Sequence, residues 1–176
     1  PSTYAHFRFG QEVYKELLPK CRTVIDAFRP LYDIGLHGPD ILFYYHALQP
    51  NAVSAVGFEA HERPGRDFFL RAAGILRQSG KAELAYIYGV LCHFALDVSC
   101  HAYVNQKIRE SGISHTEIEG EFDRSLMIAD GLNPVTHCLT GHIVPSRENA
   151  EVIAPFYDGV TADNVRTALR SMIFQN

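Results

Sequence analysis

Residues 81–109 read KAELAYIYGVLCHFALDVSCHAYVNQKIR, the longest helical pattern in the chain. Apolar residues fill most positions between Leu84 and Val98, and they do not alternate with polar residues as they would in a half-exposed strand. A helix that is apolar on most of its faces has to be surrounded by other elements. The segment is therefore predicted to be the central, buried helix of the fold.

Three polar residues interrupt this apolar helix: His93, Asp97 and His101. Residues four apart on a helix differ by about 40°, so all three project from one face. Buried polar side chains need partners, and a bound metal ion would supply one. His93 and His101 are about 12 Å apart along the helix axis, too far to share one ion easily. We therefore expect His93 and Asp97 to serve one metal and His101 its neighbour, with Asp97 able to bridge them.

The same spacing recurs 22 residues later as His115-x-x-x-Glu119. Ser114 and Glu117 form a capping-box pattern, which predicts a helix that begins at this point and runs to about Ala129. Further candidate ligands lie upstream: His6, Asp40 and His61. Imidazole and carboxylate ligands suit zinc, and also iron, manganese or nickel. The pattern predicts a helical protein with a site for more than one divalent metal.

Helical periodicity dominates the rest of the chain. Further helices are predicted at residues 4–18, 22–28, 67–78 and 163–174, and loops at 32–40, 50–57 and 133–146. Asp40 is expected at a helix start, and His37 on the surface of the loop before it. Strand patterns are essentially absent. The predicted fold is all-α: one domain over residues 1–176, built as a helical bundle with a central metal-binding helix and a multinuclear metal cleft.

Composition excludes several functional classes. The net charge of −4 leaves no general basic patch, so broad nucleic-acid binding is not expected. The longest apolar run, Leu84–Cys92, has nine residues and is too short to span a bilayer, and no signal sequence is visible. The four cysteines form no C-x-x-C pair and are predicted to be buried free thiols. These features predict a cytoplasmic protein without a transmembrane segment; its oligomeric state stays open.

The ligand candidates, in this order, resemble the zinc-dependent phospholipase C family and the fold that it shares with S1/P1-type nucleases. That family's pattern runs His, Asp, His, H-x-x-x-D, His and H-x-x-x-E. The corresponding residues here are His6, Asp40, His61, His93, Asp97, His101, His115 and Glu119. The Gly38-Pro39-Asp40 context is also similar to the family's approach to its Asp ligand. The resemblance covers about residues 6–120.

The resemblance implies a trinuclear zinc cleft that holds two to three Zn²⁺ ions. One site would consist of Asp40, His61, His93 and Asp97. A second would consist of His101, His115 and Glu119, and a third would hold His6 and share Asp97. In secreted members an N-terminal Trp coordinates the third zinc; this chain contains no Trp, and its first residue is Pro1, whose amine can still reach a metal.

The implied activity is hydrolysis of phosphodiester bonds, with a metal-bound hydroxide attacking phosphorus and Asp40 acting as general base as well as ligand. The expected partner is a small phosphoester or a phospholipid head group. Candidates for substrate contact are Arg63, Arg66 and Tyr44. Three alternatives stay open: a nuclease or nucleotidase on the same fold, a di-iron bundle of the hemerythrin type, and a metal-binding protein without catalysis.

Overall fold

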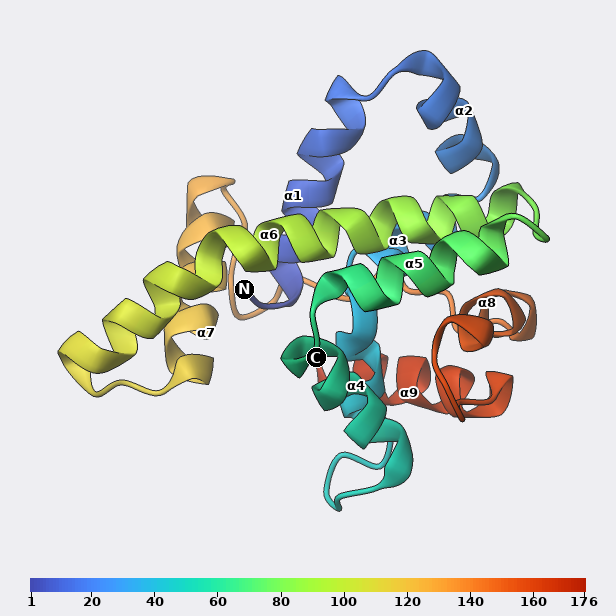
Figure 1. Cartoon of the computed structure of the whole chain (residues 1–176). Helices are drawn as coiled ribbons and strands as arrows, with labels where there is room; N and C mark the ends of the chain where they lie inside the picture. The colour runs from blue at the N-terminus through green and yellow to red at the C-terminus, as the bar shows by residue number, and fades with distance from the viewer.

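The computed structural model describes residues 1–176, and all its regular elements are helices (Figure 1). This confirms the all-α prediction. The α-helices are α1 (Thr3–Glu16), α2 (Pro19–Ala27), α3 (Arg29–Gly35), α4 (Ala52–Glu62), α5 (Gly65–Leu76), α6 (Lys81–Ser111), α7 (His115–Ala129), α8 (Arg147–Ile153) and α9 (Ala162–Gln175). Two 3₁₀-helices complete the fold, η1 (Gly38–Tyr44) and η2 (Ala154–Phe156).

Helix α6 is the central element, as its sequence predicts, but the prediction that it is buried on most faces is wrong: Leu91, Phe94 and Val98 are 44%, 40% and 63% exposed. It runs across the whole molecule, with α1, α2 and α3 packed along one side and α5 along another (Figure 1). Its N-terminal half contributes Ala85, Tyr86 and Val90 to the main hydrophobic core. Its C-terminal half extends past the body of the molecule and pairs with α7 to form an arm (Figure 1). The polar face of α6 lies where this arm joins the body.

The crossing of α3 and α6 brings two backbones into contact. A Cβ atom on Gly89 of α6 would lie 2.2 Å from the Tyr32 carbonyl oxygen, and one on Gly35 of α3 would lie 2.3 Å from the Tyr86 carbonyl oxygen. Neither position leaves room for a side chain. The two glycines therefore fix how closely α3 approaches α6, and with it the place of the η1 segment that follows α3.

Two segments that were predicted to be loops are largely helical. Residues 32–40 were expected to be a loop, yet α3 extends to Gly35 and η1 begins at Gly38. Pro30 lies in the first turn of α3, where a proline is compatible with a helix. Residues 50–57 were expected to be loop-like, but α4 begins at Ala52. The Asn51 side chain caps α4 by accepting a hydrogen bond from the Ser54 N–H at 2.9 Å.

Other boundaries follow the predictions closely. The Ser114 hydroxyl accepts a hydrogen bond from the Glu117 N–H, which confirms the predicted capping box of α7. The second helix begins at Pro19, three residues earlier than predicted, because proline is favoured at the first helical position. The helices α8 and η2 were not predicted. Among the four free cysteines only Cys92 is buried, so the prediction of four buried thiols is wrong for the other three.

By length and composition alone, α6 would be long and apolar enough to cross a membrane. Its most apolar window is 39% buried inside this structure, and a core helix of a soluble protein passes the same test. The absence of a transmembrane segment stays a prediction.

Candidate metal centre

The polar face of α6 provides the centre of the site. Asp97 lies between two histidines of its own helix: His93 Nε2 is 3.4 Å from Asp97 Oδ2, and His101 Nε2 is 3.8 Å from Asp97 Oδ1. The residues His93 and Asp97 are buried, at 4% and 9% exposure. Each carboxylate oxygen of Asp97 thus faces a different histidine, which is the arrangement that a bridging carboxylate requires.

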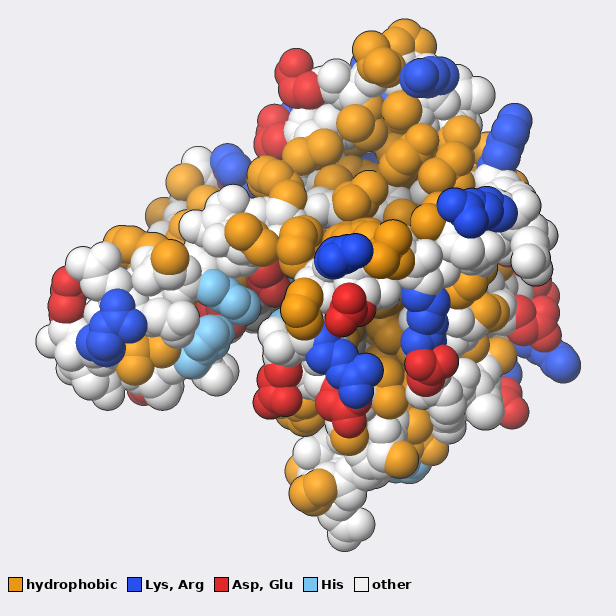
Figure 2. Space-filling model, in the orientation of Figure 1, with side chains coloured by type: hydrophobic (Ala, Val, Ile, Leu, Met, Phe, Trp, Pro, Cys, Tyr) orange, Lys and Arg blue, Asp and Glu red, His pale blue; other side chains and the backbone are white.

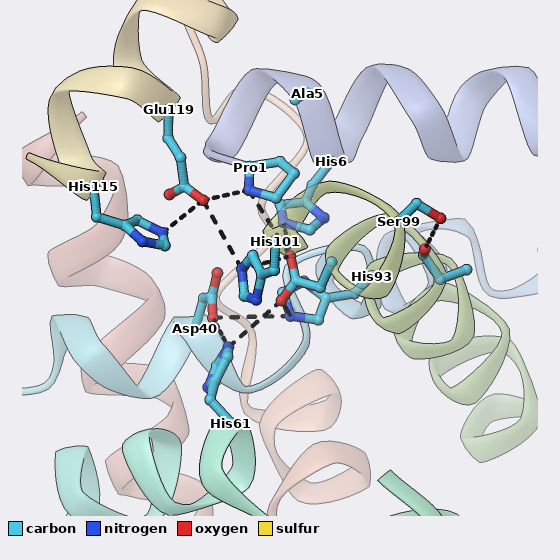
Figure 3. Close-up of polar contacts among 12 residues, drawn as sticks. Pro1, Ala5, His6, Asp40, His61, His93, Ser99, His101, His115 and Glu119 are labelled. Carbon is cyan, nitrogen blue, oxygen red and sulfur yellow. Dashed lines mark hydrogen bonds and ion pairs between the residues drawn. The ribbon is translucent and has the colours of Figure 1, made fainter. Parts of the chain in front are cut away.

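Asp40 of η1 and His61 of α4 approach this face from the opposite side (Figure 3). His61 Nε2 lies 2.9 Å from Asp40 Oδ1 and 3.8 Å from Asp97 Oδ2. The other ring nitrogen, His61 Nδ1, is 2.8 Å from the Gly57 carbonyl oxygen one turn earlier in α4. A carbonyl partner fixes the ring orientation and leaves Nε2 free to serve as a metal ligand.

Helix α7 supplies the third part of the site. His115 Nε2 lies 2.8 Å from Glu119 Oε1, and His101 Nε2 lies 4.0 Å from the same oxygen. Donor atoms of His101, His115 and Glu119 all lie within 4.8 Å of one another, and the same holds for His61, His93 and Asp97. The two repeated spacings of the sequence therefore meet in one cleft.

The N-terminal segment completes the cluster. His6 of α1 places Nε2 3.3 Å from Asp97 Oδ1, and its ring stacks on that of His93. The Pro1 nitrogen lies 2.6 Å from Glu119 Oε1 and 3.9 Å from Asp97 Oδ1. All eight candidate ligands are thus brought together, and Pro1 joins them (Figure 3).

Asp123 holds the N-terminal segment in this position, a role that the sequence prediction missed. Its buried carboxylate accepts hydrogen bonds from the Tyr4 and Ala5 N–H groups, at 2.7 and 3.0 Å. Those donors belong to the first turn of α1 and have no partner within the helix. Asp123 follows Glu119 by four residues on α7, and Glu119 follows His115 by four, so all three lie on one face of the helix.

Five buried polar atoms of the cluster make no hydrogen bond of normal geometry, although three of the five face another candidate ligand at 3.3, 2.9 and 2.8 Å. They are both ring nitrogens of His6, His93 Nδ1, Asp40 Oδ1 and Glu119 Oε1. A buried polar atom without a partner is costly, and the cost is larger for a charged group. Divalent zinc binds to such imidazole nitrogens and carboxylate oxygens. The residues present therefore fit a multinuclear metal centre, and the unpartnered atoms are those that a metal would satisfy.

The charges of the cluster support the same conclusion. Burial opposes ionisation of Asp97, but nearby histidines, His6 foremost, lower its pKa below the ordinary value. The pKa of Asp40 is also lowered, because His93 and His61 outweigh burial. Burial and the neighbouring His6 lower the pKa of His93 to about 4. Ionised carboxylates and neutral imidazoles are the forms that bind metals.

His61 differs from His93 in its protonation. Burial disfavours the imidazolium, yet contact with Asp40 outweighs burial and raises the pKa of His61 to about 9. A metal ion at this position has to displace the proton from His61.

Seven of the eight candidate ligands, all except His93, line a cleft of about 540 Å³. Tyr44 lies on its wall, together with Phe43 and Phe58. Arg63, in contrast, is exposed and forms an ion pair with Glu59 at 3.1 Å, and neither Arg63 nor Arg66 is among the residues that line the cleft. Of the three substrate-contact candidates, the structure brings only Tyr44 to the cleft.

His37 is buried, which corrects its predicted surface position. Its Nε2 atom lies 2.7 Å from His142 Nε2, in the loop between α7 and α8, and His142 stacks on Phe7. The next residue, Gly38, has φ of +49°, and a Cβ there would lie 2.5 Å from the His93 ring. No local signal predicted the pairing, because the two histidines are 105 residues apart.

A comparison with known protein families identifies the family to which this chain belongs. The profile described as zinc dependent phospholipase C matches residues 5–159. The chain belongs to the zinc-dependent phospholipase C family. All eight candidate ligands lie within the matched region. Searches of curated proteins and of solved structures found no significant match.

Membership of the zinc-dependent phospholipase C family makes this chain a phospholipase C-like hydrolase and implies zinc as its metal. It favours zinc over the iron of the hemerythrin-type alternative.

Proposed function

We propose that this protein hydrolyses phosphodiester bonds in the cleft, with two to three zinc ions as cofactor. The observation that carries the proposal is the convergence of eight histidine and carboxylate residues, four of which have buried polar atoms without a hydrogen bond. When bound, zinc polarises a phosphoryl oxygen and lowers the pKa of a bound water toward neutrality. The remaining steps depend on the side chains of the cleft.

We divide the ligands into the three sets that the resemblance to the family implies. We assign Asp40, His61, His93 and Asp97 to the first zinc, and His101, His115 and Glu119 to the second. His6 and Asp97 would hold the third, beside the Pro1 nitrogen. Asp97 takes part in two sets because its two oxygens face different histidines.

The cleft contains no lysine or arginine side chain that could hold a phosphate group. Its lining contains three carboxylates, those of Asp40, Asp97 and Glu119. A phosphodiester anion would be repelled from these carboxylates in the absence of metal. Substrate binding should therefore depend on zinc, which would neutralise the substrate charge in place of lysine or arginine.

Asp40 is proposed as the general base. Its Oδ1 atom is buried beside His61, whereas Figure 3 shows its second oxygen pointing toward the centre of the cleft. This oxygen would accept a proton from the attacking water as the new P–O bond forms and the ester P–O bond breaks. The alcohol leaves, and the phosphomonoester stays until it is released. The substrate is a small phosphoester or a phospholipid head group, with Tyr44 on the wall beside it.

The test compares Asp40→Asn with the wild type after chelation and reconstitution with zinc. We expect the wild type to hydrolyse bis(p-nitrophenyl) phosphate only with zinc, and Asp40→Asn to lose about 100-fold or more in kcat. Asp67→Asn, an exposed aspartate of α5, is the matched control and should keep full activity. Circular dichroism and zinc content verify that the variants are folded and loaded. Equal rates for Asp40→Asn and wild type would exclude the general-base role, and absence of zinc-dependent turnover would exclude the proposed activity.

A further inference from the structure

Helix α6 carries an apolar stripe that stays accessible at the surface. The stripe consists of residues spaced alternately four and three apart: Leu84, Tyr88, Leu91, Ala95, Val98 and Ala102. None of the six is buried, and Leu91 and Val98 are 44% and 63% exposed. In Figure 1 no other helix crosses in front of the middle of α6, and Figure 2 shows apolar side chains at the surface along its course.

The stripe lies on a different side of α6 from the metal ligands. Because a helix turns by about 100° per residue, each residue of the stripe is turned by about 100° or more from Asp97. Between Glu83 and Lys107, Asp97 is the only Asp, Glu, Lys or Arg residue of α6, and it faces the metal centre. The stripe therefore carries no charge, and none of its residues is a candidate ligand.

The spacing of the stripe is the one that helices use when they pack along each other as a coiled coil. Steps of four and three residues average about 3.5, close to the turn of a helix, so the stripe follows one line along α6. From Leu84 to Ala102 it rises about 27 Å. Single exposed apolar residues are common, but six in one line indicate a surface that packs against another apolar helix.

The order of large and small side chains indicates which helix this is. The larger side chains lie in the N-terminal half of the stripe and the smaller ones in the C-terminal half. Two α6 helices can pack antiparallel about a two-fold axis level with His93. The facing pairs are then Leu84 with Ala102, Tyr88 with Val98, and Leu91 with Ala95. Each pair joins a larger side chain to a smaller one, which fills the space evenly, whereas a parallel pair would place large on large and small on small.

We propose that this stripe is the interface of a homodimer, in which the α6 helices of two copies pack antiparallel. A surface that complements itself forms a closed two-fold pair. No charge has to be desolvated, because the stripe carries none. One pair of helices of this length is a small interface, so association is expected in the micromolar range. Dimerisation and hydrolysis can fail independently, because the stripe and the metal centre lie on different sides of α6.

The test measures the mass of the chain in solution by sedimentation velocity over the micromolar range. The wild type should approach twice the monomer mass of 19.7 kDa as its concentration rises. Leu91→Glu places a carboxylate at the middle of the stripe and should weaken association about 100-fold or more. Leu48→Glu is the matched control, because Leu48 is 99% exposed in the loop between η1 and α4, and it should associate like the wild type. Circular dichroism verifies that both variants are folded.

A mixture of two variants tests the antiparallel arrangement. Ala95→Lys alone should also lose association, because its ammonium would face Leu91 of the second copy. Mixed with Leu91→Glu, it should restore the dimer, since the new carboxylate then faces the new ammonium and the other pair keeps Leu91 against Ala95. In a parallel dimer the two charges would not face each other, and mixing would restore nothing.

Three results would overturn the proposal: a wild type that stays monomeric over this range, a Leu91→Glu variant that dimerises like the wild type, or a mixture that does not associate. A monomeric wild type that sediments with vesicles of phosphatidylcholine and phosphatidylserine, and loses this binding in Leu91→Glu, would overturn it as well. The stripe would then bind a membrane surface instead of a second copy of the chain.

Discussion

The buried His37 and the half-buried His142 illustrate how single residues support the site. Their Nε2 atoms are 2.7 Å apart, so one ring donates a hydrogen bond and the other accepts it, which requires that the accepting ring is neutral. Burial and the neighbouring His142 lower the pKa of His37, and burial with the nearby Arg29 lowers that of His142 to about 4. The pair links the loop after α7 to the segment that carries Asp40.

This pair makes stability depend on pH. Because its folded pKa lies below the ordinary value, the unfolded chain binds protons first as the pH falls. The stability that neutral His142 adds to the folded state is complete above about pH 6.5 and is lost between pH 6.5 and 4. We expect urea denaturation at pH 7 and pH 5 to show a loss of stability that is about 1 kcal/mol smaller in His142→Gln than in wild type. Equal losses in both proteins would contradict a neutral His142.

Among the elements, α3 and α6 determine where the metal ligands lie. Gly89 precedes His93 by one helical turn, and its Cα packs against the α3 backbone. The same crossing places η1, and with it Asp40, opposite Asp97. The position of the cluster thus depends on contact between two backbones as well as on the ligands themselves.

Two glycine substitutions should change the stability of the protein in opposite directions, because only Gly89 lies at the contact between α3 and α6. Gly89→Ala would place Cβ 2.2 Å from a carbonyl oxygen and should destabilise the protein by about 2 kcal/mol. Gly74→Ala, in α5, meets nothing within 4 Å and should stabilise it by about 0.5–1 kcal/mol, because alanine favours helices. Thermal unfolding distinguishes them. A Gly89→Ala variant as stable as the wild type would show that the two helices do not meet this closely.

Local patterns predicted some elements and missed others for physical reasons. The apolar run of α6 and the Ser114 capping box of α7 are short-range signals, and both helices form as predicted. Helices α3 and α4 were missed because glycine and proline lower helix propensity, whereas packing against α6 and η1 stabilises them here. Tertiary contacts of this kind leave no periodic pattern in the sequence.

In the candidate site, too, residues with a local sequence pattern were predicted and residues held by distant contacts were missed. Most of its ligands stand four residues apart on α6 or α7, so their spacing alone placed them on common faces. Asp123 was missed because its partners, Tyr4 and Ala5, are more than 100 residues away. Arg63 and Arg66 were expected near the substrate from sequence proximity to His61, but both are exposed and neither lines the cleft.

For the whole molecule, the metal centre requires distant parts of the chain at once. Five elements supply its residues: α1, η1, α4, α6 and α7. Such a site cannot exist in the unfolded chain, so the free energy of zinc binding also stabilises the fold. Figure 2 shows histidine side chains at the surface where the α6–α7 arm meets the body. The arm is thus joined to the rest of the molecule through the same cluster that would hold the metal.

The most direct test of the central claim is the zinc content of the purified chain. The protein is produced without a metal-binding tag, loaded with zinc, separated from unbound metal by gel filtration, and analysed by plasma mass spectrometry. We predict two to three zinc ions per folded chain, and fewer in His115→Ala, which removes a ligand of the second set. A chain that retains its helical circular dichroism and binds no zinc would contradict it.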